Sequence, residues 1–355
     1  MPYRRSRLAS AVALTSAFFL PAPPACAQSA ASATWSVTIV LSPTLVAGGP
    51  ATLAVFGADG RLASGVTVET SRDQRVTTDS TGRATFTAPA QGDFLLARSL
   101  SDASVALLDT GADANAAATA PSGTSHALVL APVISLKDRF TICGGGFRGD
   151  ADANRVQINA QRALILAASP ACLVVLPGPK SSPGPVVVTV QTGDTQRTAA
   201  STLVTLEYDS PAAMVPGKKT KLAVRVRGTG QSLRIVVENQ TPGVLRFVRG
   251  DTQEVRTSGG VNNFAEIEVQ PVRSGDYSFH ARLVPPPDPS AAQRYLRAAE
   301  PLAPKDLQHR LRDFADRLAR HPNDSEKIRR QLDRVISSTI AGDLRTLLQA
   351  AEAAL

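Results

Sequence analysis

The sequence predicts a mainly β protein, built from tandem β-sandwiches and ending in an α-helical hairpin. Between residues 35 and 284, short alternating runs rich in β-branched residues, such as "LAVRVRG" and "VVVTVQT", are separated by Gly, Pro, Asp and Ser. No helical period lies between these runs, which favours sandwiches over a parallel sheet with crossover helices. After "PPPDP" at 285–289 the hydrophobic period becomes 3.6 residues, which predicts the helices.

The first 27 residues have the pattern of a secretory signal peptide. A basic segment, "MPYRRSR", precedes an apolar run and a segment that ends in Ala25-Cys26-Ala27. We therefore expect cleavage before Gln28 and export to the periplasm, the cell surface or the medium. Lipoprotein anchoring at Cys26 is the alternative, but Pro23 stands where the usual aliphatic residue would be. No later apolar run reaches the roughly 20 residues of a transmembrane helix, so no transmembrane segment is expected.

Charge and aromatic content argue against nucleic acid as a partner. The formal net charge of +8 falls to +5 without Arg4, Arg5 and Arg7, and aromatic residues make up 5% of the 355 residues. A nucleic-acid-binding protein would combine clustered Lys and Arg with stacking aromatics. The mild positive charge is typical of a solvated surface near an anionic envelope.

Two shifts in composition divide the β-rich region. Residues 110–125, "TGADANAAATAPSGTS", have the composition of a flexible linker, and a weaker break falls at 207–219. The predicted organisation is a signal peptide at 1–27, a first sandwich at 28–109, a linker at 110–125, a second sandwich at 126–208, a third sandwich at 209–287 and a helical module at 288–355.

The second predicted sandwich carries the most specific motif of the chain. Its successive segments are "FTICGGGF" (140–147), "NRV" (154–156), "LVVLP" (173–177) and "GPVVVTV" (184–190). This order resembles the IPT/TIG domain, which has an immunoglobulin-like fold; Asn159-Ala160 departs from the glycines common there. The resemblance implies an adhesive, spacing or ligand-presenting module. It also implies structural roles for Gly144, Gly146, Phe147, Asn154, Val156 and Pro177.

The other two predicted sandwiches carry weaker signals. "TTDSTGRATFTAPAQGDFLLA" (77–97) resembles prealbumin-like and bacterial immunoglobulin-like modules, and Gly275-Asp276-Tyr277 precedes a last strand as in other such sandwiches. The expected fold is therefore a series of tandem immunoglobulin-like β-sandwiches with a C-terminal α-helical hairpin.

Cys143 and Cys172 are the cysteines that would remain after signal cleavage. In an oxidising compartment they predict a disulfide, which would bridge the sandwich and be buried. Closing this loop would stabilise the fold by roughly 3–3.5 kcal/mol in the chain-entropy model. Two buried free thiols are the alternative. No histidines stand near the cysteines, which argues against zinc.

The C-terminal region contains an apolar stripe at helical spacing, which needs a surface to cover it. It could pack on a sandwich, on a third helix or on another protein. A shorter helix is a further candidate at "SAAQRYLRAAE" (290–300), before the stripe. The stripe is thus a possible partner-binding helix face, formed by Leu307, Leu311, Phe314, Leu318, Ile328, Leu332 and Val335.

No catalytic residue, cofactor or metal site is expected. The histidines fall in no H-E-x-x-H motif, and no serine lies in G-x-S-x-G. The turn Asp150-x-Asp152-x-Asn154 begins like a calcium loop, but Arg155 and Gln161 replace the Gly and Glu that such a loop needs. Weak calcium binding at this acidic turn stays open. The Arg148-Gly149-Asp150 tripeptide, which overlaps the start of this turn, is interpreted as a chance feature of an exposed turn.

These observations predict an exported, non-enzymatic binding or scaffolding protein of the bacterial cell envelope or surface. It would act in protein–protein interaction, adhesion or spacing, with a protein or an envelope component as partner. A carbohydrate-binding or enzyme-accessory module is the first alternative, although a single Trp and four Tyr supply few stacking platforms for sugars. An enzyme with an unrecognised site is the second. The sequence leaves the oligomeric state open.

Overall fold

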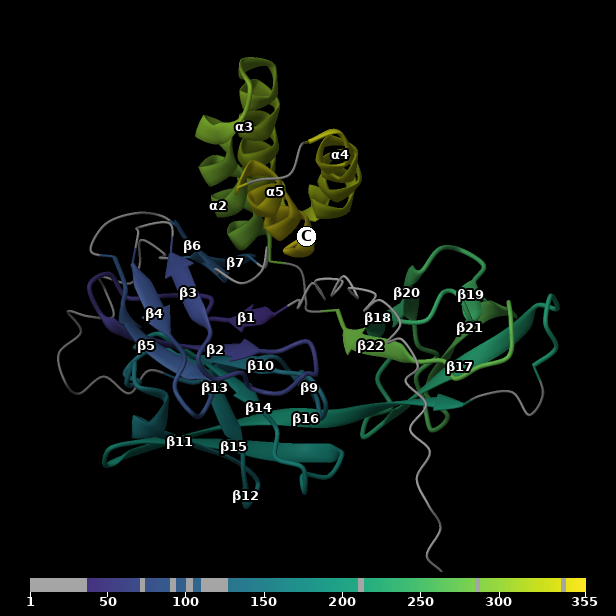
Figure 1. Cartoon of the computed structure of the whole chain (residues 1–355), viewed down its shortest axis with the longest axis horizontal. Coiled ribbons are helices and arrows are strands. Elements are labelled where there is room, and N and C mark those ends of the chain that lie inside the picture. Colours follow the sequence, from purple (N-terminus) through teal and green to yellow (C-terminus); the bar gives the residue numbers. More distant parts are fainter. Residues whose placement is uncertain are drawn as a thin grey trace, which may run out of the picture. The chain divides into compact units, whose positions relative to one another are not determined.

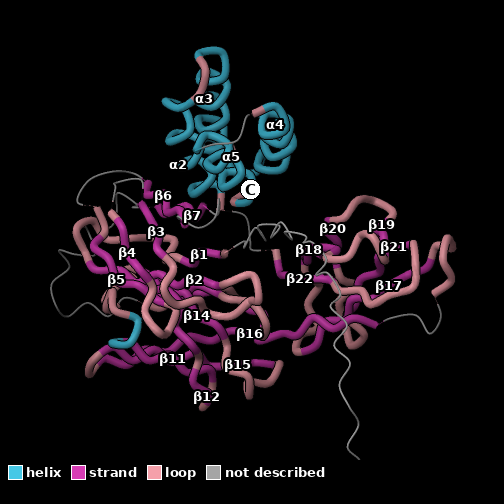
Figure 2. Tube along the Cα trace, viewed as in Figure 1, coloured by secondary structure: helices cyan, strands magenta, loops and turns pink. Residues whose placement is uncertain are grey.

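The computed structural model describes residues 37–70, 74–89, 94–99, 105–109, 127–209, 214–284, 288–339 and 343–355. In this part of the chain the strands β1 to β22 precede the helices α2 to α5 (Figure 1, Figure 2). The mainly β class with C-terminal helices is thus confirmed. The predicted signal peptide at 1–27 and the predicted linker at 110–125 lie outside the described residues.

The first sandwich comprises two sheets around a core that includes Leu53, Val55, Val68 and Phe86. On β3 the buried and half-buried side chains alternate, as the period of two requires, whereas β2 is buried along most of its length. One sheet contains β1 (Thr38–Val40), β2 (Pro50–Phe56) and β5 (Arg83–Thr87). The other contains β3 (Thr67–Thr70), β4 (Arg75–Thr77), β6 (Phe94–Ser99) and β7 (Val105–Asp109).

The second sandwich encloses a core that includes Ile142, Phe147, Val156 and Leu173. Its first sheet contains β8 (Val129–Leu130), β10 (Phe140–Cys143), β13 (Leu164–Ala168) and β14 (Cys172–Leu176), and it continues into the first sandwich through the pairing of β13 with β2. Its second sheet contains β9 (Val133–Ser135), β11 (Asn154–Ile158), β12 (Gln161–Arg162), β15 (Gly184–Thr192) and β16 (Thr195–Asp209). A 3₁₀ turn, η1 (Ala151–Ala153), leads into β11.

The strand β16 belongs to the second and the third sandwich at once. Residues 195–203 pair with β15, and residues 205–209 pair with β17 (Thr220–Arg227). Leu203 lies in the core of the second sandwich, whereas Val204 lies in that of the third. The boundary that we placed at residue 208 therefore falls inside a continuous strand (Figure 1). The reason is visible in "STLVTLEYD", in which no Gly or Pro interrupts the apolar residues.

The third sandwich has a core that includes Leu222, Val237, Phe247 and Ile267. Phe279 lies at the centre of its aromatic cluster, with ring centroids 5.3–5.4 Å from those of Tyr208, Phe247 and Tyr277. One sheet continues from β16 and β17 to β21 (Phe264–Pro271) and β19 (Leu245–Phe247). The other contains β20 (Thr252–Arg256), β18 (Arg234–Asn239) and β22 (Phe279–Leu283).

The C-terminal module contains more helices than the predicted hairpin. In the described residues these are α2 (Pro289–Ala299), α3 (Lys305–Arg320), α4 (Ser325–Ser338) and α5 (Asp343–Ala353). Asp288 caps α2 by accepting a hydrogen bond from the Ala291 N–H, and Pro289 occupies the first helical turn. The apolar stripes of α3 and α4 pack against α2 and α5, including Leu296 and Leu348. The module therefore has a hydrophobic core of its own.

Candidate functional site

The predicted disulfide is present, but it lies within one sheet. Cys143 on β10 and Cys172 on β14 are directly opposite each other in the antiparallel register, with their Cα atoms 4.1 Å apart. Cys172 is buried and Cys143 is half-buried. The bond therefore joins neighbouring strands, whereas we expected it to bridge the two sheets and to bury both sulfurs. Sequence spacing identifies the pair but does not tell which sheet each strand joins.

The glycine run forms a backbone turn between β10 and a buried phenylalanine. Gly144, Gly145 and Gly146 all have positive φ, at 145°, 68° and 71°, a region that side chains with a Cβ avoid. The carbonyls of Gly144 and Gly145 face a cation. The Arg197 guanidinium donates to the Gly145 oxygen at 2.8 Å and lies 4.6 Å from the centroid of the Phe147 ring. Burial lowers the pKa of Arg197. This turn supports the sandwich and presents carbonyls, not N–H groups, to the charged group beside it.

The Arg148-Gly149-Asp150 tripeptide lies against the first sandwich. Gly149 is buried, and its carbonyl accepts a hydrogen bond of 2.7 Å from the Thr52 hydroxyl on β2. A Cβ added to Gly149 would stand 1.9 Å from the Pro50 carbonyl oxygen. The middle of the tripeptide is therefore covered, which corrects our interpretation of an exposed turn for Gly149. Arg148 and Asp150 are exposed.

The acidic turn that follows is held by hydrogen bonds within the protein. Asp150 caps η1 by accepting from the Asp152 N–H at 2.9 Å. The Asn154 side chain is buried; its amide donates to the carbonyls of Arg148 and Asp150, and its oxygen accepts from the Arg148 N–H and the Thr192 hydroxyl. These bonds explain the need for Asn at position 154. Among the described residues, no group of three or more His, Cys, Asp or Glu side chains is arranged to hold a metal ion.

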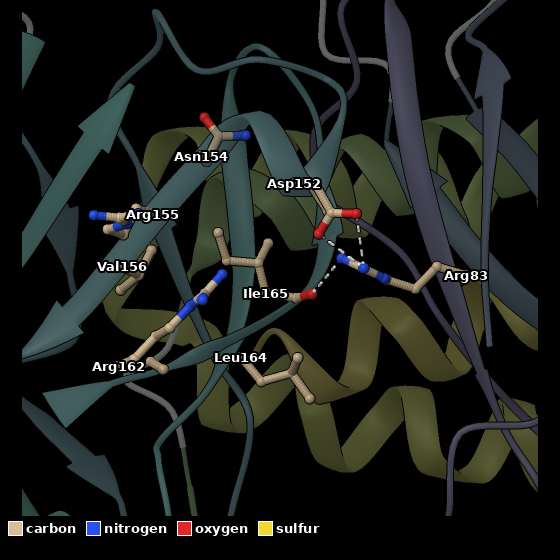
Figure 3. Close-up of a pocket in the computed structure, with 10 residues that line it drawn as sticks. Arg83, Asp152, Asn154, Arg155, Val156, Arg162, Leu164 and Ile165 are labelled. Atoms are coloured by element: carbon tan, nitrogen blue, oxygen red, sulfur yellow. Dashed lines mark hydrogen bonds and ion pairs between the residues drawn. The ribbon is translucent and has the colours of Figure 1, made fainter. Parts of the chain in front are cut away.

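Arg83 on β5 connects this turn to the first sandwich. Its Nη2 donates to both carboxylate oxygens of Asp152, at 2.8 and 2.9 Å, and its Nε donates to the Thr81 hydroxyl at 3.0 Å. Its Nη1 lies 3.5 Å from the Ile165 carbonyl oxygen on β13 (Figure 3). The Arg83 side chain is 11% exposed, whereas that of Asp152 is 72% exposed. A buried cation is thus paired with a carboxylate at the surface.

Further polar and apolar contacts complete the joint between the first and second sandwiches. The hydroxyls of Ser42 and Ser169, both fully buried, lie 2.9 Å apart, and Ser169 donates to the Thr44 carbonyl at 2.6 Å. Close by, Ala168 on β13 pairs with Thr52 on β2. An apolar cluster contributed by both sandwiches fills the space beside these bonds: Val40, Ala54, Leu166, Ala167 and Val174. The two sandwiches therefore share both polar and apolar buried contacts.

The joint between the second and third sandwiches contains titratable side chains. The His280 Nε2 on β22 lies 3.3 Å from Oδ1 of Asp138, which precedes β10. The other oxygen, Oδ2, is buried without a hydrogen-bond partner among the described residues. Burial, and secondly the charge of Asp138, raise the pKa of Tyr208 to about 12, opposed by the backbone N–H of Ala281. The cluster thus combines an acid and an imidazole with the phenol of Tyr208, which lies on the shared strand β16.

A shallow depression of about 340 Å³ opens beside Arg83 and Asp152 (Figure 3). Its apolar floor includes Leu164, which is 43% exposed. Arg155 on β11 and Arg162 on β12 line it, and they also line an adjoining depression of about 240 Å³. Three arginine side chains thus gather around this concave surface.

The remaining predicted residues have structural positions. Val156 and Pro177 are buried in the second sandwich. Of the stripe residues, Leu311, Phe314, Leu318, Ile328, Leu332 and Val335 are buried in the helical core, and Leu307 is partly buried against it. A partner could reach this face only if the module opened. His309 and His321 are exposed on the helical module, and His126 lies outside the described residues.

Sequence reasoning missed Arg83, Thr52, Tyr208 and Asp138. Arg83 follows the "DSTG" turn and looks like any surface arginine at a strand start, and Asp138 stands in an ordinary polar loop, "LKDR". Tyr208 offered a signal, because a tyrosine that ends an apolar alternation often needs a partner for its hydroxyl. The contacts of all four depend on the packing of one sandwich against the next, which no local pattern encodes.

The family comparison agrees with the geometry of the second sandwich. The model of the IPT/TIG domain family matches residues 132–208. Residues 132–208 form an IPT/TIG domain. The strand order around the glycine turn and Phe147 therefore belongs to a TIG domain, and the resemblance inferred from "FTICGGGF" is confirmed. No curated protein matches the sequence.

Solved structures show distant likenesses. The Bacteroides ovatus mixed-linkage glucan utilization protein SGBP-B, in complex with a heptasaccharide, is 11% identical with a TM-score of 0.18, over 69% of this chain and 60% of that one. A tandem from titin is 10% identical with a TM-score of 0.19, over 70% and 95%. A plexin extracellular region is 12% identical with a TM-score of 0.26, over 68% and 31%. This chain thus spans less than two thirds of the SGBP-B and plexin chains, and none of these likenesses bears on function.

Proposed function

We propose that the protein is an exported, non-enzymatic scaffold of the bacterial cell envelope. It holds its TIG domain at a fixed position and orientation relative to the two neighbouring sandwiches, and in this way it spaces or presents a binding surface. The observation that carries this proposal is the continuity of β16, which supplies strands to the TIG domain and to the third sandwich. A shared strand has no linker residues at which two domains could swing independently.

The joint on the other side of the TIG domain supports the same function. Ser42, Ser169 and Gly149 are buried between the first sandwich and the TIG domain, and an apolar cluster adjoins them. Breaking this joint would expose the apolar cluster to water, which costs free energy, and would exchange the hydrogen bonds between the sandwiches for bonds to water. A chain with fixed joints at both ends of its central domain is suited to holding domains at fixed distances from one another. It is less suited to closing around a substrate.

Export is supported by the disulfide between Cys143 and Cys172, because such bonds persist in oxidising compartments. The hydrophobic pattern of residues 1–27 supports a cleaved leader. Among the described residues, no helix is long and apolar enough to cross a membrane.

The scaffold function is tested by measuring distances across the joints in the full-length mature protein. Spin labels are placed on exposed positions of the first and third sandwiches, at Arg61 and Arg246, and a second pair joins Arg61 to Lys180 of the TIG domain. We expect narrow distance distributions in pulsed electron paramagnetic resonance for both pairs. Broad distributions for both pairs would show that the sandwiches move independently and would overturn the proposal.

Export is tested separately in cells that express the whole chain. Fractionation should place the protein outside the cytoplasm, and the mature N-terminus should be Gln28. Retention of the whole chain in the cytoplasm with Met1 still present would contradict the assignment to the envelope.

A further inference from the structure

The depression beside η1 carries an excess of positive charge that is not balanced by carboxylates of its lining. Its lining contains the side chains of Arg83, Arg155, Arg162 and Asp152, which together carry three positive charges and one negative charge. Asp152 is engaged by Arg83 through two hydrogen bonds of 2.8 and 2.9 Å. The one acid of the lining is therefore already neutralised by a buried arginine.

Among the described residues, the positive charges of Arg155 and Arg162 at the mouth of the depression are not paired with a carboxylate. Both are exposed, and in the described part of the chain no carboxylate lies within 4.0 Å of either guanidinium. They come from different strands, β11 and β12, and both line each of the two adjoining depressions. In Figure 3 they lie on the side of the depression away from Arg83. Like charges held together without a counter-charge raise the local positive potential, which attracts anions.

We propose that Arg155 and Arg162 form a binding site for an oxyanion group, a carboxylate or a phosphate, on a small ligand that also has an apolar face. A guanidinium offers planar, paired N–H donors that match the oxygens of these two groups. The apolar face follows from the floor, where Leu164 is partly exposed beside Ile165 and Val156. A volume of about 340 Å³ lies at the small end of ligand sites and fits one sugar ring with an acidic substituent.

The joint between the first sandwich and the TIG domain affects the net charge of this site. If Arg83 did not engage Asp152, the free carboxylate would lie in the same lining as the two exposed arginines and would compete with the ligand. The site is thus complete only when the first sandwich is docked on the TIG domain. This inference rests on one part of the proposed function, the fixed joint between the first sandwich and the TIG domain, and does not need the joint with the third sandwich. Narrow distance distributions without anion binding would overturn the site and leave the scaffold function standing.

The test is a titration of the full-length mature protein with sodium glucuronate, glucose 6-phosphate and neutral glucose, at low ionic strength, followed by NMR shifts or calorimetry. We expect saturable binding of at least one of the two anions and weaker or no binding of glucose. A preference between the anions tells whether the natural group is a carboxylate or a phosphate. Absence of saturable binding by both anions, or equal binding of glucose, overturns the proposal.

Variants separate a specific site from general charge. R155Q/R162Q should weaken anion binding about tenfold or more, because charge-assisted hydrogen bonds to the anion are lost. R148Q is the matched control, since Arg148 is also exposed in the TIG domain but does not line the depression, and it should change binding by less than about twofold. D152N should tighten binding by removing the negative charge. Equal losses in R148Q and R155Q/R162Q, or weaker binding in D152N with an unchanged fold, count against the site.

Discussion

Arg83 of the first sandwich donates through Nη2 to both carboxylate oxygens of Asp152, which lies in the turn before β11 of the TIG domain. The arginine is nearly buried and the aspartate is largely exposed. The cation is therefore the desolvated partner, and its other nitrogens are satisfied by Thr81 and the Ile165 carbonyl. This one side chain ties together a turn of the first sandwich, a strand of the TIG domain and the acidic turn.

R83A should lower the free energy of unfolding by about 1–2 kcal/mol, because the variant loses charge-assisted hydrogen bonds at the joint. The exposure of Asp152 keeps the loss at this level, since water can solvate the carboxylate that remains. Urea denaturation measures the change. R61A, an exposed arginine of the same sandwich, is the control and should stay within about 0.5 kcal/mol of the unsubstituted protein. Equal stabilities of R83A and R61A would mean that the ion pair does not stabilise the joint.

Gly149→Ala should destabilise the protein by about 3 kcal/mol or more, because the new Cβ would overlap the Pro50 carbonyl. The backbone oxygen cannot rotate away as a flexible side chain could. Gly243→Ala is the control, since its nearest neighbour is the end of the Arg273 side chain at 3.9 Å. Thermal unfolding and limited proteolysis of both variants give the comparison. A Gly149→Ala protein that unfolds like Gly243→Ala would show that the tripeptide is not packed against the first sandwich.

Local patterns predicted the strands and the cysteine pairing but not the contacts between domains. "FTICGGGF" predicted the turn and the buried Phe147, because positive φ and close packing impose glycine and an aromatic residue at fixed places. The ion pair between Asp152 and Arg83 could not be predicted, because the two residues are 69 positions apart and each looks like a surface charge. The continuity of β16 was missed because alternation alone does not show where one strand leaves one sheet for another.

The same reasoning explains the helical region and the candidate anion site. The stripe of α3 and α4 was predicted from its period, but its covering by α2 and α5 needed knowledge of tertiary packing. Arg155 appeared in the sequence only as a residue that spoils a calcium loop. Its proximity to Arg162 arises from the pairing of β11 with β12, and the apolar floor comes from β13.

Reduction of the disulfide between Cys143 and Cys172 should lower the free energy of unfolding by about 3.5 kcal/mol in the chain-entropy model, given a sequence separation of 29. The effect arises mainly because the unfolded chain gains freedom. Urea unfolding with and without a reductant measures it, with C143S/C172S as the control that should not respond to reductant. Non-reducing mass spectrometry should show the two cysteines linked. Identical unfolding curves in both conditions would refute the stabilising role.

Leu332→Ala should destabilise the helical module by about 2–5 kcal/mol, because it opens a cavity at a fully buried position in the helical core. Leu302→Ala is the matched control, since Leu302 is 52% exposed and should change stability by less than about 0.5 kcal/mol. Helical circular dichroism during thermal unfolding measures both. If Leu332→Ala left the module intact but abolished binding to an envelope partner, the stripe would be an interaction face instead of a core.

Deletion of residues 288–355 should leave a folded, β-rich remainder, because the buried residues of the helical core all lie between Ala292 and Leu355. One ion pair of 3.3 Å, between Arg329 on α4 and Glu254 on β20, would be lost from a partly exposed position. Burial acts to raise the pKa of Glu254, but hydrogen bonds from Arg234 and Arg329 lower it overall, and Arg234 would remain after the deletion. Near-ultraviolet circular dichroism and size-exclusion chromatography of the truncated protein test this. Aggregation of the remainder would show that the helices complete a sandwich core.

Tyr208 should ionise well after an exposed tyrosine as the pH is raised. Burial, then the negative charge of Asp138, raise its pKa from 10.0 to about 12, because both disfavour the phenolate. The neutral phenol thus contributes stability that is fully present below pH 10 and is lost as the pH rises towards about 12. Absorbance at the tyrosinate band, recorded with circular dichroism to confirm folding, should show a late transition that is absent in Y208F. In D138N the transition should move to lower pH, since one of the two causes is removed. If the late transition persists in Y208F, it belongs to another tyrosine. If the transition is not shifted in D138N, Asp138 does not raise the pKa of Tyr208 across the joint between the TIG domain and the third sandwich.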